Sequence, residues 1–299
     1  MILGGVEAGG TKFVCLVGDG EGRILAEQRI PTRGPRETLA DAVDALRRAT
    51  VETGALDAIG VGAFGPLDLR PGPKHGRLLS TPKPGWSGVD LVSPLRDAFG
   101  VPVAIHTDVT AAALAEGRWG AARGVESFAY MTVGTGIGAG VITGGRPLHG
   151  LVHPELGHVN VPRAPGDDFP GVCPFHGDCL EGMASGPAIA ARWGVPAEDL
   201  DGPLRERAVD LEAVYLASGI RTLVYAVAPE RIMLGGGVAA LAGLLPRVRA
   251  HHAVALGGYP GLPEHADTAF VQAAGLGGMA GPRGALVIAE SAAARGGDA

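Results

Sequence analysis

The chain has 299 residues, a length that suits one large domain or two lobes of ordinary size and can bury a substantial core. Apolar residues make up 46% and charged residues 19%, which excludes an intrinsically disordered chain. The 50 glycines and 23 prolines lie between apolar, strand-like runs, so we interpret them as turns and sites of close backbone approach. A net charge of −6 gives no overall attraction to nucleic acid or to anionic membranes.

The N-terminal residues hold no basic segment and no small-residue cleavage site, so we expect no secretion signal and a cytoplasmic protein. The longest charge-free stretch, 127–145, is rich in glycine, serine and threonine. It therefore predicts a strand, a turn and a second strand rather than a membrane span. Three cysteines do not make a disulfide framework, and a close Cys/His group in a reduced compartment suggests a metal site.

Hydrophobic periodicity predicts alternating strands and helices over the first 119 residues. The expected strands are 2–6, 13–17, 23–30, 58–63 and 101–105, and the expected helices are 36–53, 91–99 and 109–119. A Gly-Gly-Thr-Lys turn joins the first two strands.

The same pattern then begins again. We expect a strand at 128–133, a glycine-rich turn at 134–140 and a returning strand at 140–143, which is a weak internal repeat and suggests two related lobes. An irregular segment at 150–182 follows, and later a strand at 230–234 and a terminal helix at 284–295. Strands mixed with helices indicate the α/β class.

Two glycine-rich turns, Gly9–Lys12 and Gly134–Gly138, each carry a threonine and offer backbone N–H groups that could approach phosphate oxygens. Either one alone could equally be a tight hairpin. A third glycine run at 235–237 favours the phosphate interpretation. The chain has no P-loop motif. Gly134-x-Gly136-x-x-Ala139 loosely fits a dinucleotide fingerprint, but a strand follows it where that fingerprint needs a helix, so we reject it.

Asp108 lies between the strand predicted at 101–105 and the helix predicted at 109–119. One interpretation is a helix N-cap, for which aspartate is among the best residues. The other is a general base, because a carboxylate at a helix N-terminus stays ionised and phosphoryl transfer to a hydroxyl needs a proton acceptor.

Cys173, His176 and Cys179 follow one another at steps of three residues, and His158 precedes them by fifteen. Two cysteines and two histidines make a complete tetrahedral zinc set of the structural kind. The segment has few core residues, so a metal would supply its order. His153 is the rival fourth ligand, and unligated surface residues are the plain alternative.

Together these motifs resemble the ROK family of sugar kinases and repressors, and within it the bacterial fructokinases. The resemblance is carried, in family order, by Glu7-Ala-Gly-Gly-Thr-Lys12, Phe64-Gly-Pro66, Thr81-Pro-Lys-Pro-Gly-Trp86, Thr107-Asp108, Gly134-Thr-Gly-Ile-Gly-Ala-Gly140, His153-Pro-Glu-Leu-Gly-His158, Cys173 to Glu181, Ser185-Gly-Pro187 and Gly235-Gly-Gly-Val238.

The resemblance implies an actin-like (ribonuclease H-like) two-lobed kinase fold with a zinc-stabilised loop. The lobes would be 1–118 and 119–283, with a helix at about 284–299 packed back on the first lobe and a zinc loop at 153–181 in the second. It implies ATP, Mg²⁺ and Zn²⁺ as cofactors, a sugar and ATP as small-molecule partners, no nucleic acid or membrane, and a homodimer.

The resemblance also implies the site residues. Asp108 would be the catalytic base. His158 is then preferred over His153 as the fourth zinc ligand, beside Cys173, His176 and Cys179. The sugar contacts would be Thr107, Glu155, Glu181, Pro84, Gly85 and Trp86. The ATP contacts would be Gly9, Gly10, Thr11, Lys12, Thr135, Gly136, Pro187, Gly235, Gly236, Gly237 and Val238.

The function expected from this resemblance is phosphorylation of fructose to fructose 6-phosphate. Thr110 and Ala63 depart from the usual fructokinase pattern, so another hexose such as mannose or glucose is the main alternative. A sugar-sensing regulator is less favoured, because the first predicted strand directly follows Met1 and leaves no DNA-binding module before it.

Overall fold

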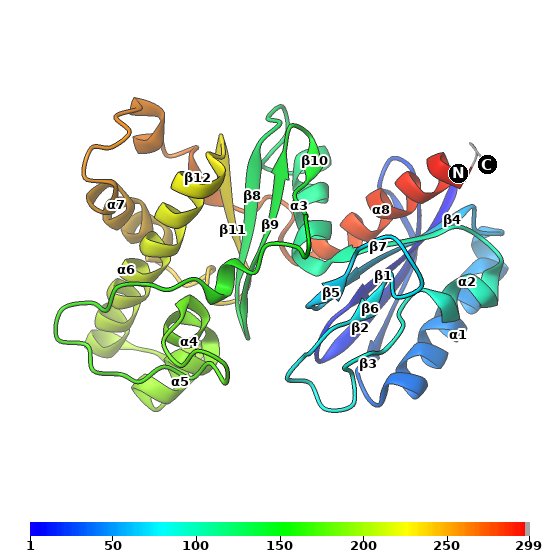
Figure 1. Ribbon diagram of the computed structural model, residues 1–299, viewed down its shortest axis with the longest axis horizontal. Helices are drawn as coiled ribbons and strands as arrows, with labels where there is room; N and C mark the ends of the chain where they lie inside the picture. Colours follow the sequence, from blue (N-terminus) through cyan, green and yellow to red (C-terminus); the bar gives the residue numbers. More distant parts are fainter. Residues whose placement is uncertain (297–299) are drawn as a thin grey trace. The chain divides into compact units, whose positions relative to one another are not determined.

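The computed structural model describes residues 1–296, and its chain divides into two compact units (Figure 1). Unit 1 comprises residues 1–119, 147–153 and the chain from 278 onward; unit 2 comprises 120–146 and 154–277. The terminal helix expected at 284–299 extends, for residues 297–299, outside the described residues. Among the helices of residues 1–296, none has the length and apolar character that crossing a membrane requires.

Unit 1 is built on a five-stranded sheet with the order β3-β2-β1-β4-β7. Antiparallel pairing joins β1 to β2 and β2 to β3, whereas β1–β4 and β4–β7 are parallel. The strands are β1 (Ile2–Ala8), β2 (Lys12–Asp19), β3 (Ile24–Pro31), β4 (Ala58–Ala63) and β7 (Val103–Thr107). A separate hairpin pairs β5 (Leu67–Asp68) with β6 (Arg77–Leu78).

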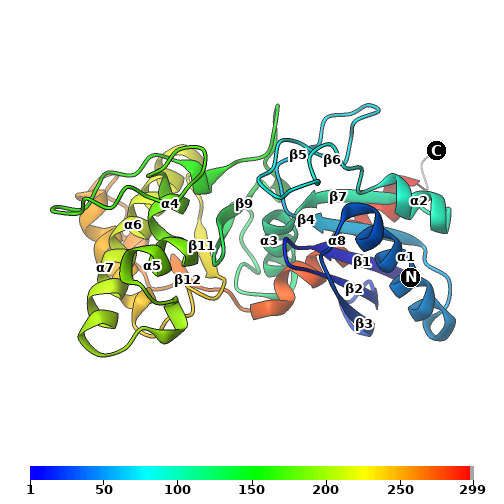
Figure 2. The same ribbon diagram turned by 90° about the horizontal axis from the view of Figure 1, so that it is seen from below.

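Helices cover both faces of this sheet (Figures 1 and 2). Phe13, Cys15 and Val17 of β2 pack into one core cluster with α1 (Pro35–Thr53) and α2 (Ser93–Phe99). The alternate residues Val14 and Leu16 pack into a second cluster with α3 (Asp108–Trp119) and α8 (Ala280–Gly296). The strand's period of two residues therefore explains why the sheet is buried on both faces.

Unit 2 repeats this plan with the strand order β10-β9-β8-β11-β12. Its strands are β8 (Phe128–Val133), β9 (Ile137–Thr143), β10 (Arg146–Pro147), β11 (Arg231–Gly235) and β12 (Val271–Ala273). As in unit 1, an antiparallel hairpin (β8–β9) is followed by parallel partners (β11 and β12). Two similar sheets are what the internal repeat predicts.

The helices of unit 2 pack into one large core, to which the long helix α6 contributes most of its apolar residues. They are α4 (Leu180–Ala184), α5 (Gly186–Trp193), α6 (Gly202–Val227) and α7 (Leu244–Leu256). Short 3-10 turns occur at Leu156–His158, Ala197–Asp199, Pro263–Ala266 and Gly277–Met279.

Most predicted elements are confirmed, but several boundaries are wrong. The terminal helix expected from Gly284 begins at Ala280, and the first strand, expected at 2–6, continues to Ala8. The returning strand expected at 140–143 begins at Ile137, because Gly138 and Gly140 pair with β8 instead of forming a turn. The strand expected at 101–105 begins at Val103, after Pro102, which has no N–H to donate. The helix expected from Leu91 begins at Ser93. The small β5–β6 hairpin was not predicted.

Candidate active site and metal centre

Asp108 opens α3 directly after β7, and its carboxyl does not cap the helix. The cap comes from Thr107, whose Oγ1 accepts a hydrogen bond from the Thr110 N–H at 3.2 Å and donates to Thr110 Oγ1 at 2.7 Å. Asp108 Oδ1 accepts from the neighbouring Val109 N–H, at 2.8 Å. The N-cap interpretation of Asp108 is therefore wrong.

Asp108 and Glu7 form a pair of acids in unit 1. Burial raises the pKa of the Asp108 carboxyl to about 6. Burial and the nearby Asp108 charge raise the pKa of Glu7 to about 7, against the lowering effect of Lys12. Gly281, at the start of α8, makes room for Glu7, because a Cβ there would lie 2.0 Å from Glu7 Oε1. A carboxyl with a pKa near 6 suits a general base working near neutral pH.

The Gly9–Lys12 turn joins β1 to β2, as predicted, and its last three residues are exposed. The Gly9 N–H donates to the Lys12 carbonyl at 3.0 Å, and Lys83 Nζ donates to the Gly10 carbonyl at 2.5 Å. Lys83 thus holds the turn from outside, and it belongs to the same 81–86 motif as the expected sugar contacts.

Within that motif Pro84 and Gly85 are exposed, but Trp86 is only 1% exposed. Its ring packs against Phe13 and Phe64, with centroids 5.8 and 5.4 Å away, and its Nε1 donates to the Arg33 carbonyl at 3.2 Å. The indole is a core residue of unit 1, and its contact with a sugar stays a prediction.

A pocket of about 740 Å³ lies within unit 2. Four of the residues predicted to contact ATP line it: Thr135, Pro187, Gly237 and Val238. Sequence reasoning missed the rest of the wall, which consists of Gly134, Gly186, Ala190, Pro196, Ala197, Glu198, Arg205, Ala240, Leu241 and Ala242. Apart from Gly134 and Gly186, these residues belong to no motif. Only Pro196 and the two charged residues, Glu198 and Arg205, stand out in the sequence.

The glycines of the third run, 235–237, have two different surroundings. Gly235 and Gly236 pack against β8: a Cβ on Gly235 would lie 2.3 Å from the Tyr130 hydroxyl, and one on Gly236 would lie 2.3 Å from the Val133 carbonyl. Gly237 has open space around it and lines the pocket. The run therefore brings the chain after β11 close to the sheet before it reaches the pocket.

The start of α5 faces the same pocket. Ser185 caps this helix by accepting from the Ala188 N–H at 3.3 Å, and Pro187 occupies its first turn. The Gly186 N–H donates to the Gly134 carbonyl at 2.7 Å, so the second glycine turn is fastened to this helix start. A helix N-terminus and adjacent backbone amides are favourable for phosphate groups.

Glu181 lies in the first turn of α4 and also touches the second glycine turn. Its Oε2 accepts a hydrogen bond from the Ile137 N–H at 2.9 Å. Thr135 and Gly136 therefore connect the pocket wall to this carboxylate. Glu155 immediately precedes the 3-10 turn Leu156–His158.

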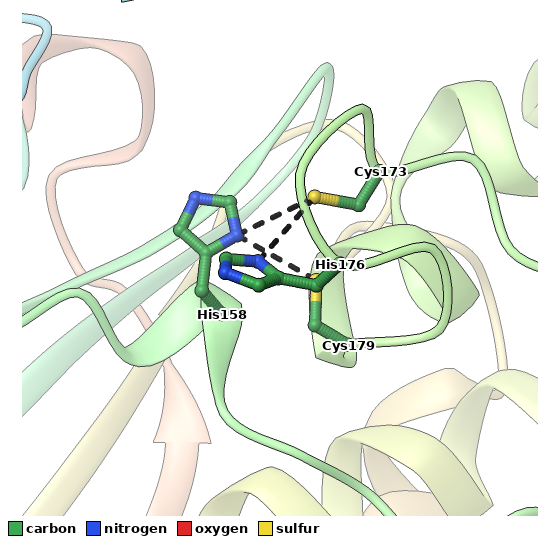
Figure 3. A group of neighbouring side chains, drawn as sticks. All are labelled: His158, Cys173, His176 and Cys179. Atoms are coloured by element: carbon green, nitrogen blue, oxygen red, sulfur yellow. Dashed lines mark hydrogen bonds between the residues drawn. The ribbon is translucent and has the colours of Figure 1, made fainter. Parts of the chain in front are cut away.

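His158, Cys173, His176 and Cys179 converge, as the spacing predicts (Figure 3). Their donor atoms all lie within 4.8 Å of one another. The Sγ–Nδ1 separations are 3.7 Å for Cys173–His158, 3.7 Å for Cys173–His176 and 3.5 Å for Cys179–His158. With tetrahedral Zn–S and Zn–N bonds, a sulfur and a nitrogen lie about 3.6 Å apart. The four residues therefore fit a zinc ion in both donor chemistry and spacing.

His153 is not part of this cluster. Its Nε2 accepts a hydrogen bond from the Leu67 N–H at 3.0 Å, in unit 1. The rival interpretation of His153 as the fourth ligand is therefore wrong.

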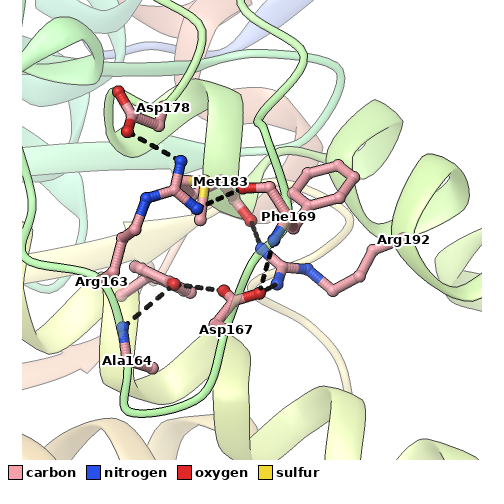
Figure 4. Close-up of polar contacts among 8 residues, drawn as sticks. Arg163, Ala164, Asp167, Phe169, Asp178, Met183 and Arg192 are labelled. Carbon is pink, nitrogen blue, oxygen red and sulfur yellow. Dashed lines mark hydrogen bonds and ion pairs between the residues drawn. The ribbon is translucent and has the colours of Figure 1, made fainter.

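A polar network holds the loop that leads into the cluster (Figure 4). Asp167 accepts from the Tyr215 hydroxyl and pairs with Arg192, which also donates to the Met183 carbonyl at 3.2 Å. Arg163 pairs with Asp178 at 2.9 Å, next to Cys179 of the cluster. The loop is thus fastened to α4, α5 and α6 as well as by the cluster itself.

Comparison with known proteins agrees with these motifs. The ROK family model matches residues 3–292. The chain is 44% identical over 295 residues to a fructokinase from Zymomonas mobilis, covering 97% of each chain. It is 41% identical to a fructokinase from Pediococcus pentosaceus, covering 98% of this chain and 99% of the relative.

Among solved structures, the ROK hexokinase from Thermus thermophilus matches with a TM-score of 0.81 and 34% identity over the whole of both chains. A ROK glucokinase from Streptomyces griseus, in complex with glucose and AMPPNP, matches with a TM-score of 0.75 and 29% identity, over 97% of this chain and all of that one. These matches confirm the expected two-lobed, actin-like α/β fold. With a family model that spans nearly all of its length, this chain belongs to the ROK family.

Proposed function

We propose that this protein is an ATP-dependent fructokinase that transfers the γ-phosphoryl group of ATP to the 6-hydroxyl of fructose. The observation that carries the chemistry is the carboxyl of Asp108, which opens α3 without capping it and has a pKa of about 6. The relatives named fructokinase, 41–44% identical over nearly the full length, support fructose as the acceptor.

In the proposed reaction, Asp108 accepts the proton of the 6-hydroxyl as that oxygen bonds to the γ-phosphorus, and the bond from the γ-phosphorus to ADP breaks. A pKa of about 6 leaves most of this carboxyl ionised at neutral pH and makes it a stronger proton acceptor than an ordinary carboxylate. Thr107, Glu155 and Glu181 would orient the sugar hydroxyls, together with the 84–86 segment.

ATP would lie with its adenosine in the pocket of unit 2, against Pro187, Gly237 and Val238. The proposed phosphate contacts are Gly9, Gly10, Thr11 and Lys12 of the first glycine turn and Thr135 and Gly136 of the second. Gly235 and Gly236 would let the chain before Gly237 pack closely against β8, next to the pocket. When bound, Mg²⁺ would neutralise phosphate charge, and the carboxylate of Glu7, two residues before the first glycine turn, offers an oxygen donor of the kind that it prefers.

We further propose that the Cys/His cluster holds a structural Zn²⁺, because four protein ligands leave no open position for catalysis. The ion would order the loop that carries Glu155 and Glu181. The use of ATP and the need for reduced thiols favour a cytoplasmic location, and a homodimer stays a prediction.

A coupled assay of ADP release tests this function, with fructose, mannose and glucose as acceptors. Fructose should give the highest kcat/KM, and treatment with a zinc chelator should abolish activity. Faster turnover of mannose or glucose would overturn the choice of sugar. No ADP release with any hexose would overturn the kinase itself and favour a sugar-binding regulator.

A further inference from the structure

We propose that His153 is a positioning residue for Glu155, which it holds in place through the buried amide of Leu67; this rests on the proposed sugar-binding role of Glu155. His153 is the last residue that packs with unit 1 before the chain enters unit 2 at Pro154. Two residues further on, the chain reaches Glu155.

The contact of His153 is specific. The side chain is only 5% exposed, and its Nε2 accepts the Leu67 N–H at 3.0 Å. A ring nitrogen that accepts carries no proton, so His153 is neutral with its proton on Nδ1. Leu67 is fully buried, and its N–H would lose this partner if the imidazole were removed. The hydrogen bond therefore fixes the ring to the main chain of β5 and not to a mobile surface group.

The anchor on Leu67 rests on a rigid part of unit 1. Leu67 begins β5, which pairs with β6. Just before it, the Phe64 N–H donates to the Ala8 carbonyl at the end of β1 at 2.9 Å, and the Phe64 ring packs on buried Trp86. His153 is thus tied to the end of the strand that leads into the first glycine turn.

The backbone between His153 and Glu155 has little conformational freedom, so the position of His153 limits where Glu155 can lie. Pro154 has a fixed φ and also restricts the residue before it to extended conformations. On the other side, His158 lies in the metal cluster, and Gly157 lies so close to β9 that a Cβ there would be 1.8 Å from the Ile137 carbonyl. Glu155 therefore lies two residues after the contact of His153 and three residues before His158 of the cluster.

Loss of the first anchor should misplace Glu155 and affect the sugar more than the nucleotide. In His153→Met, which keeps the volume and removes the acceptor, we expect the KM for fructose to rise about tenfold, since small misplacements of a positioning group cost this much or more. The KM for ATP and the zinc content should stay unchanged. His153→Gln, whose amide oxygen can accept the same N–H, should restore the wild-type KM. His149→Gln, at an exposed histidine of the same segment, is the matched control.

Hydrogen exchange of the Leu67 amide, followed by NMR, tests the anchor without any activity. Protection should be strong in the wild type and in His153→Gln, and weak in His153→Met. Should His153→Met fail to fold, the NMR coupling across the hydrogen bond from Leu67 N–H to His153 Nε2 decides the matter in the wild type. An unprotected Leu67 amide, an absent coupling, or an unchanged fructose KM in folded His153→Met would overturn the proposal. A wild-type protein that phosphorylates no hexose would instead overturn the proposed function.

Discussion

The two arginines of the network in Figure 4 give a sharp test of how the zinc loop is held. Arg192 pairs with Asp167, and the two side chains are only 9% and 10% exposed. Arg163 pairs with Asp178, and their side chains are 39% and 40% exposed. The perturbation is the same at both positions: Arg192→Met and Arg163→Met each remove one guanidinium.

The burial of each ion pair sets how much unfolding free energy the variant should lose. Removal of one partner of a buried ion pair costs about 3–5 kcal/mol, because the other charge stays buried without compensation. Asp167 would keep only the Tyr215 hydroxyl and the Phe169 N–H as donors. Arg192 also lies over the Phe169 ring at 4.3 Å, a contact that the variant loses. An exposed pair contributes about 0–1 kcal/mol, so Arg163→Met should cost at most that much.

Urea unfolding of the metal-loaded protein, followed by circular dichroism, measures both values. Arg192→Met should lower the free energy of unfolding by several kcal/mol, and Arg163→Met by less than about 1 kcal/mol. Equal losses in the two variants would refute the argument that burial sets the strength of the network. Zinc content should be measured in parallel, because a loosened loop should also lose metal faster.

Four further outcomes are expected. His252 is 1% exposed, stacks on Phe270, and has no partner for either ring nitrogen within residues 1–296, so His252→Phe should raise the free energy of unfolding by about 1 kcal/mol or more. Burial lowers the pKa of His252 to about 4, so the contribution of His252 to stability should fall as pH drops from 6.5 towards 4, and pH-dependent melting of His252→Phe should lack this contribution. The pKa of Glu7 is raised from 4.5 to about 7, so the contribution of Glu7 to stability should be lost as pH rises through that interval, and the difference in melting temperature between the wild type and Glu7→Gln should change over the same interval. Zinc analysis should find about one metal ion per chain, and chelation should open the 158–181 loop to proteolysis while most of the fold stays intact; under ~0.2 ion per chain would exclude the site.

Local patterns predicted the parts of the site that depend on local spacing. Three of the four cluster residues lie within seven positions of one another, so their convergence follows from a short loop whatever the rest of the fold does. Asp108 was similarly marked by its place between a strand and a helix. Its neighbour Thr107 was expected to touch sugar, but the structure also uses its hydroxyl as the helix cap, which decides between the two interpretations of Asp108.

Features that depend on distant contacts escaped sequence reasoning. Asp167 meets Tyr215 across 48 positions, and His153 meets Leu67 across 86, and no local pattern encodes either contact. The burial of Trp86 arises from two phenylalanines on other segments. Arg205 lines the pocket from the first turns of α6, but its sequence context is that of an ordinary surface residue on a helix.

The central claim is that the carboxylate of Asp108 takes the proton of the acceptor hydroxyl. The most direct measurement is the turnover of Asp108→Asn with saturating fructose and ATP, since the amide keeps the shape of the side chain but cannot act as a base. Turnover should fall by at least about 10²-fold, with little change in ATP affinity. Near-normal turnover in this variant would contradict the account.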